Sequence, residues 1–119
     1  MSSIQQSLHE ALTVNGSLVA AVVDANSGLL LGSAGSGVDI ELAAAGNTEV
    51  VRAKLATMKS LKLNDVIEDI LITLGKQYHI IRPIAKSKGI FLYFVLDKSK
   101  ANLALARHKL QEIEGLIEL

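Results

Sequence analysis

Apolar residues recur every three or four positions in three segments of the chain, which is the spacing of an amphipathic helix. Each segment follows a residue whose side chain can cap a helix N-terminus, and the first closes at Asn15-Gly16, where glycine tolerates a left-handed conformation. The pattern predicts helices from Ile4 after Ser2 or Ser3, over 40–61 after Asp39, and around 103–117 after Asp97 or Ser99.

Five runs rich in Val, Ile and Leu lie between the helical segments and are bounded by turn residues. Leu18–Asp24 and a run that starts at Leu29 flank Asn26-Ser27-Gly28, which predicts a hairpin. The glycine-rich residues 32–37 that follow are predicted to form a flexible loop. Three more strands are predicted as an antiparallel meander, with the first of them at an edge of the sheet: Val66–Leu74, Tyr78–Ile84 and Ile90–Leu96.

The order of these elements predicts an α+β fold in which three helices flank a five-stranded antiparallel sheet. The chain has 119 residues, which suits one domain over residues 1–119. Half of the residues are hydrophobic, yet the aromatic residues are only two Tyr and two Phe, so the core must be aliphatic. So much apolar content in a short chain favours more than one buried face, and therefore self-association.

The charged residues argue against some partners. Twelve basic and twelve acidic residues cancel, whereas a surface that binds nucleic acid needs an excess of basic residues. The longest apolar run, Ile90–Leu96, is far shorter than the ~20 residues that span a bilayer, so we expect a soluble cytoplasmic protein without membrane insertion. Residues 1–51 contain five acids and no Lys or Arg, which is either ordinary surface variation or a means of steering a protein partner.

No motif in the sequence predicts catalysis. The glycine-rich segment matches neither phosphate-binding pattern, and a nucleophile elbow around Ser36 would need glycine where Ala34 stands. Glu68 and Asp69 are adjacent in a predicted strand, so their side chains should point to opposite faces. Cysteine is absent, and the histidines lie on separate elements without the spacing of metal ligands: His9, His79 and His108. We therefore expect no catalytic residue, metal or cofactor.

Four segments carry a resemblance to a known family. They are a hydrophobic strand running into a polar turn, part of the central helix, part of the fourth strand, and the opening of the last helix: Val22–Gly28, Glu49–Leu55, Tyr78–Pro83 and Ala101–Arg107. Together with the element order, they resemble the roadblock/dynein light-chain family, bacterial single-domain members above all. That family is related to the longin and profilin-like domains, and the resemblance spans essentially the whole chain.

The resemblance implies a homodimer in which the central helices pack antiparallel and the third strands pair edge to edge into a ten-stranded sheet. The implied interface residues are Gly46, Asn47, Val50, Val51, Lys54, Leu55, Met58, Ile67, Asp69, Ile70 and Ile72. Family members serve as dynein accessory chains, as scaffold subunits for small GTPases and as regulators of Ras-like GTPases. A Ras-like small GTPase is therefore the partner that the resemblance implies. Candidate contacts with it are Arg52, Lys86 and Lys88.

Other functions remain open at this point. A dynein-light-chain-like adaptor would have the same dimer but no GTPase partner. A ligand-sensing domain of profilin-like or PAS-like shape would need a cavity with convergent polar groups, which the aliphatic core disfavours. An enzyme would need a nucleophile, a metal set or an acid–base pair, and the sequence offers none of these.

Overall fold

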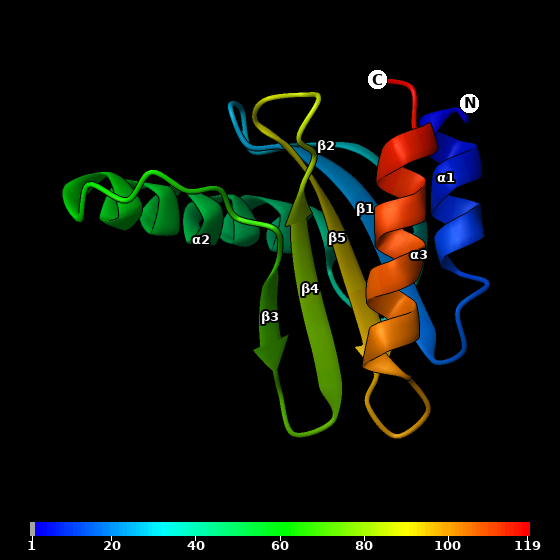
Figure 1. Ribbon diagram of the computed structural model, residues 1–119. Helices are drawn as coiled ribbons and strands as arrows, with labels where there is room; N and C mark the ends of the chain where they lie inside the picture. The colour runs from blue at the N-terminus through cyan, green and yellow to red at the C-terminus, as the bar shows by residue number, and fades with distance from the viewer. Residues whose placement is uncertain (1) are drawn as a thin grey trace.

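The computed structural model describes residues 2–119. Its elements, in chain order, are α1 (Ile4–Ala11), β1 (Ser17–Asp24), β2 (Leu29–Gly35), α2 (Ile40–Ser60), β3 (Ile70–Thr73), β4 (Gln77–Pro83), β5 (Ile90–Asp97) and α3 (Leu103–Leu116) (Figure 1). The sheet has five antiparallel strands in the order β2-β1-β5-β4-β3. The predicted α+β class, element order and meander are confirmed.

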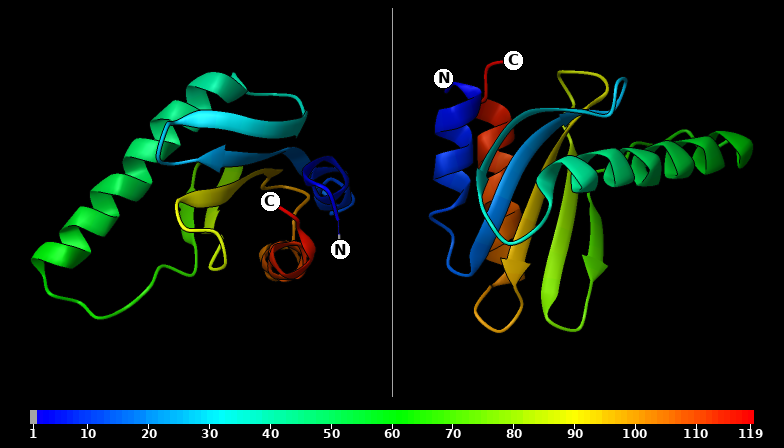
Figure 2. Two further views of the ribbon diagram at one scale, coloured as in Figure 1. Left: turned by 90° about the horizontal axis from the view of Figure 1, so that it is seen from above. Right: turned by 180° about the vertical axis from the view of Figure 1, so that it is seen from behind.

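The elements form three layers, with α1 and α3 on one face of the sheet and α2 on the other (Figure 2). We call these the helix-pair face and the α2 face. Strand β5 lies at the centre and is buried on both sides. Its Leu92, Phe94 and Leu96 pack under the helix pair, whereas Phe91 and Tyr93 pack on the α2 face. An aliphatic core with a few aromatic residues is thus divided into two clusters by the sheet.

The helix starts agree with the predicted caps at two of the three positions. Ser3 forms a capping box with Gln6, and the Asp39 carboxylate accepts a hydrogen bond from the Leu42 N–H. The prediction for α3 is wrong, because its N-cap is Asn102. Asp97 is engaged earlier in the chain, where its carboxylate accepts hydrogen bonds from the N–H and hydroxyl of Ser99. The turn between β5 and α3 is therefore longer than the sequence suggested.

Residues 32–37 do not form a loop throughout, so the prediction of a flexible loop over this whole segment is wrong. Strand β2 continues to Gly35, and Gly32 lies under α1, where a Cβ would collide with Ile4. Gly35 has a φ of +88°, and a Cβ there would overlap the Leu18 carbonyl oxygen. These glycines allow two close backbone approaches, and only residues 36–39 form the connection to α2.

Strand β3 is shorter than predicted, because only Ile70–Thr73 pair with β4. The Asp69 carboxylate accepts two hydrogen bonds from the Arg107 guanidinium of α3, at 2.9 and 3.1 Å. This bidentate pair holds the chain against α3 just before the strand begins. Glu68 and Asp69 therefore do not alternate across a strand.

The second half of α2 projects beyond the sheet (Figures 1 and 2). Helix α2 has 21 residues and is about 31 Å long. In its second half, the residues from Arg52 to Thr57 are all exposed, because no sheet lies beneath them. Residues 61–69 then run back along the projecting half to reach β3. We call residues 52–69 the arm. No helix in residues 2–119 is long and apolar enough to cross a membrane.

Candidate functional site

Helix α2 is fixed on the sheet by one side and by one arginine. Ala44, Thr48 and Val51 are buried against the α2 face. Arg52, predicted to contact a GTPase, donates hydrogen bonds from Nη2 to the carbonyls of Ala25 and Asn26, at 2.7 and 3.1 Å. Its Nη1 donates to the Glu49 carboxylate at 3.1 Å. Arg52 thus ties α2 to the β1–β2 turn of its own chain.

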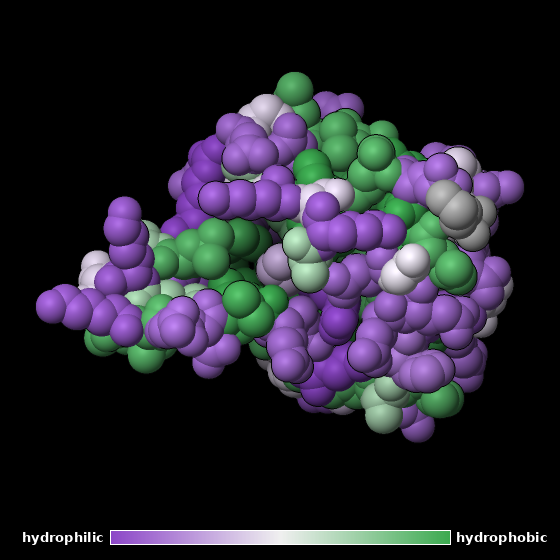
Figure 3. Space-filling model, turned by 45° about the horizontal axis from the view of Figure 1, so that its top comes forward, coloured by the Kyte–Doolittle hydropathy of each residue, from purple (hydrophilic) through white to green (hydrophobic). Residues whose placement is uncertain are grey.

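The predicted interface residues divide into two groups. Val51 and Met58 are buried within the chain, whereas Gly46, Lys54 and Leu55 are exposed. A groove of about 500 Å³ between the arm's two passes is lined by six of the predicted interface residues, Val50, Lys54, Met58, Ile67, Asp69 and Ile70. Asn47 and Ile72 lie outside that groove, both partly exposed. Apolar side chains gather along the arm (Figure 3): Leu55, Leu61, Leu63 and Val66 are all exposed.

The two edges of the sheet differ in how well they are protected. The Leu74 N–H bonds the Gln77 carbonyl, so by alternation the N–H and C=O groups of Leu71 and Thr73 point outward from β3. No proline or lysine interrupts β3. Edge β2 has a bulge opposite Val22/Val23, and Gln5 Nε2 donates to the outward Ser33 carbonyl at 3.3 Å. Strand β3 is therefore the edge more open to pairing.

A polar cluster links α2 to strands β4 and β5. His79 Nδ1 lies 2.9 Å from the Tyr93 hydroxyl, and Nε2 lies 2.8 Å from Gln77 Oε1. The rings of His79 and Tyr93 meet edge to face with centroids 5.6 Å apart. Burial raises the pKa of Tyr93, and its hydrogen bond to the Asn47 side chain partly offsets this rise. No local pattern predicts this cluster, because its members lie on three different elements.

Burial also lowers the pKa of His79 below its usual 6.5, so folding favours the neutral ring. As the pH falls through about 6.5, unfolded His79 binds a proton that folded His79 does not, so the free energy of unfolding should fall. We expect urea unfolding at fixed protein concentration to show this loss between pH 7.5 and 5.5. His79→Gln should reduce the loss, whereas the exposed His108→Gln should keep it; equal losses in all three proteins would contradict the assignment.

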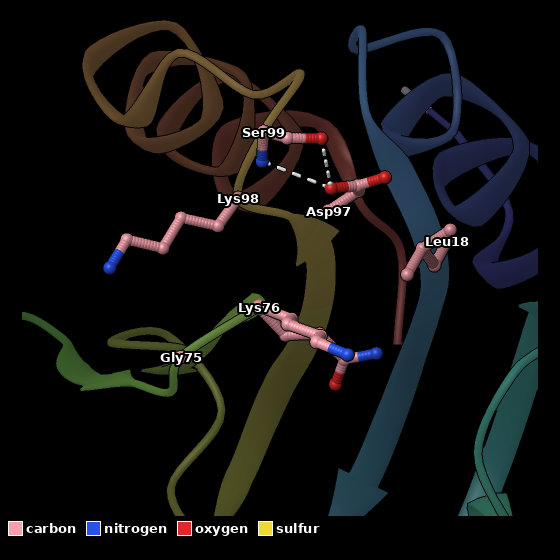
Figure 4. Close-up of a pocket in the computed structure, with 7 residues that line it drawn as sticks. Leu18, Gly75, Lys76, Asp97, Lys98 and Ser99 are labelled. Atoms are coloured by element: carbon pink, nitrogen blue, oxygen red, sulfur yellow. Dashed lines mark hydrogen bonds between the residues drawn. The ribbon is translucent and has the colours of Figure 1, made fainter.

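A second cavity opens at the ends of the strands, with a volume of about 450 Å³ (Figure 4). We call it the strand-end pocket; its lining is Leu18, Gly75, Lys76, Gln77, Asp97, Lys98 and Ser99. The Lys98 ammonium lies 5.8 Å from the centre of the Tyr78 ring. The hydrogen bonds from Ser99 lower the pKa of the Asp97 carboxyl. Neither Lys76 nor Lys98 forms an ion pair within residues 2–119.

A third cavity, of about 650 Å³, lies between α3, strand β4 and residues 68–69 just before β3, and its lining includes Arg82 and Arg107. Both arginines already hold carboxylates of their own chain: Arg82 Nε donates to Glu114 at 2.6 Å, and Arg107 holds Asp69.

Lys86 and Lys88, the other predicted partner contacts, are exposed in the β4–β5 turn, far along the sheet from the strand-end pocket. Within residues 2–119, no group of three or more His, Asp or Glu side chains could hold a metal ion.

Comparisons with known proteins define the fold. No protein-family model and no curated protein sequence matches the chain. A roadblock/LC7 domain from Streptomyces avermitilis is similar, with a TM-score of 0.81 over 96% of this chain and 93% of that one, at 11% identity. MglB from Myxococcus xanthus gives a TM-score of 0.75 over 92% and 84%, at 20% identity. MglB with a tetrameric arrangement gives 0.80 over 93% and 82%, at 16% identity.

The chain therefore has the roadblock/LC7 fold, as the sequence resemblance implied. Identities this low define the fold alone. They do not assign a partner or an activity to this chain.

Proposed function

We propose that the protein is a homodimeric interaction module, without catalytic activity of its own, that binds and regulates a Ras-like small GTPase. The observation that carries the dimer is the open edge of β3 beside the projecting arm. An edge strand of β-branched and aliphatic residues invites pairing unless something covers it, and a second copy is the simplest cover.

Gly46 supports the same interface. It lies inside α2, has no unusual φ, and nothing in the chain comes within 4 Å of the position of a Cβ. A glycine in a helix interior costs roughly 1 kcal/mol relative to alanine, so within one copy it has no compensating role. Close approach of a second helix supplies one. Gly46 shares its side of α2 with Val50 and Lys54, away from Arg52 and the β1–β2 turn.

Gly46→Ala should therefore have opposite effects on the monomer and the dimer. The free energy of unfolding of the monomer should rise by about 0.5–1 kcal/mol, because alanine is the better helix former. The dissociation constant of the dimer should rise at least about tenfold, because the methyl group separates the helices. Urea unfolding at low concentration and analytical ultracentrifugation measure the two effects.

Gly115 provides a matched control. It too lies in a helix with nothing near a Cβ, one residue before the end of α3. Gly115→Ala should stabilise the monomer to a smaller degree, because the position lies in the last turn, and leave the dissociation constant unchanged. A Gly46→Ala dimer as tight as the Gly115→Ala dimer would remove α2 from the interface.

The proposal of a GTPase partner is supported by the family resemblance together with the fold shared with MglB. The surfaces of the chain also favour a macromolecule over a small ligand, since its cavities are open grooves rather than enclosed chambers. The test is to mix the purified protein with Ras-like GTPases of the same organism, loaded with GDP or a non-hydrolysable GTP analogue. Binding that depends on the nucleotide supports the proposal. No binding to either form, with dimerisation intact, favours an adaptor without a GTPase partner.

A further inference from the structure

We propose that the strand-end pocket is a socket for the arm of a second copy, in which Lys76 and Lys98 receive the carboxylates of Asp65 and Glu68. The inference rests on the proposed homodimer and adds to it a second contact, beyond the end of the paired β3 strands at the β3–β4 turn. It assigns an occupant to a cavity that has no role within one copy.

The symmetry of an edge-to-edge dimer places the two features together. Two β3 strands that pair antiparallel in one continuous sheet are related by a two-fold axis perpendicular to that sheet. Such an axis keeps both α2 helices on the same face and exchanges the two ends of the strands. Helix α2 crosses its own sheet near the end that carries the β4–β5 turn, whereas the pocket lies at the other end (Figure 1). The arm of the second copy therefore crosses the sheet at the pocket.

The charges of pocket and arm are complementary. Lys76 and Lys98 are exposed, and the carboxylate of Asp97, which also lines the pocket, accepts hydrogen bonds from Ser99. On the arm, Asp65 and Glu68 are exposed and form no ion pair within residues 2–119. Figure 4 shows Lys76 directed into the space beside Leu18, whereas Lys98 extends the other way, over the Tyr78 ring, and has to turn to meet an incoming carboxylate.

The apolar residues of the arm point to the same contact. Val66, between the two acids, is 78% exposed, more than any other large apolar residue within residues 2–119, and Leu63 is 52% exposed. Leu18 gives the pocket an apolar wall at the start of β1. Docking would remove these side chains from water and surround them with paired charges, which is the usual arrangement of an interface core and its rim.

Charge reversal tests the socket. Lys76→Glu/Lys98→Glu makes pocket and arm both acidic, and Asp65→Lys/Glu68→Lys makes them both basic. The dimer dissociation constant of each double variant should be at least about tenfold higher than that of the wild type, measured by analytical ultracentrifugation at low salt. Mixed in equal amounts, the two variants should form a heterodimer of nearly wild-type affinity, because each arm then meets a socket of opposite charge. Lys86→Glu/Lys88→Glu reverses two lysines at the opposite strand ends and should leave the dimer unchanged.

The outcomes separate this inference from the dimer on which it rests. If both variants dimerise as tightly as the wild type, the socket is wrong and the β3 pairing stands. If the lysine variant alone is weakened and no heterodimer forms, the pocket meets some other acidic segment and the arm is not its occupant. A wild-type protein that is monomeric at micromolar concentration overturns both. Thermal unfolding of each variant verifies that a change in mass reflects the interface rather than loss of the fold.

Discussion

Thr73→Pro should convert the protein to a folded monomer. The N–H of Thr73 points outward from β3 and has no partner in the sheet, so proline removes no hydrogen bond within the chain. The same N–H is one of the groups that a second copy of β3 would use, and the proline ring would occupy the space where the second strand must lie. Light scattering at micromolar concentration should give about the mass of one chain, with a circular dichroism spectrum like that of the wild type.

Ser33→Pro is the matched control on the other edge of the sheet. Ser33 also points its N–H outward, in β2. If β3 forms the interface, Ser33→Pro remains dimeric; if β2 does, the two results are exchanged. Ile70→Pro is a poorer choice, because alternation turns the Ile70 N–H toward β4, and its loss would damage the sheet itself. A Thr73→Pro protein that is folded and fully dimeric would place the interface elsewhere.

The order of elements could be predicted because it depends on local patterns. The stripe of apolar residues along α2 and the turn residues between β1 and β2 specify their structures within a few positions of the chain. The predicted bounds of β2 and β3 were wrong because contacts between residues distant in the chain determine where these strands end and begin. The end of β2 depends on Leu18 passing close to Gly35, and the start of β3 depends on Arg107 holding Asp69. Neither contact is visible in a local window of the sequence.

The same distinction between local patterns and distant contacts applies to the candidate surfaces. Gly46, Val50 and Lys54 lie on one side of α2, and their part in an interface is a prediction that comes from the family resemblance. The strand-end pocket could not be predicted, since Lys76 and Lys98 come from two turns that only the sheet brings together. The role of Arg52 was also hidden, because its partners are the carbonyls of Ala25 and Asn26, which carry no signal in the sequence. Side chains that bind backbone atoms are in general hard to infer from residue types.

Gly35→Ala should have the largest effect on stability of any substitution considered for this chain. Gly35 has a φ of +88°, which costs a residue with a Cβ roughly 1–2 kcal/mol, and the new Cβ would overlap the Leu18 carbonyl oxygen. Leu18 cannot easily retreat, because its carbonyl also accepts the Ser36 N–H at 3.1 Å. We expect a loss of about 3 kcal/mol or more in the free energy of unfolding, measured by urea denaturation.

Gly28→Ala separates the two causes of that loss. Gly28 has a φ of +76°, but nothing lies within 4 Å of the position of its Cβ. Its substitution should therefore cost only the backbone strain, roughly 1–2 kcal/mol. The difference between the two variants measures the close approach of β2 to β1, which also positions residues 36–39 and the Asp39 cap from which α2 starts across the sheet. Equal losses in both variants would mean that Leu18 yields easily and that this approach does not fix the start of α2.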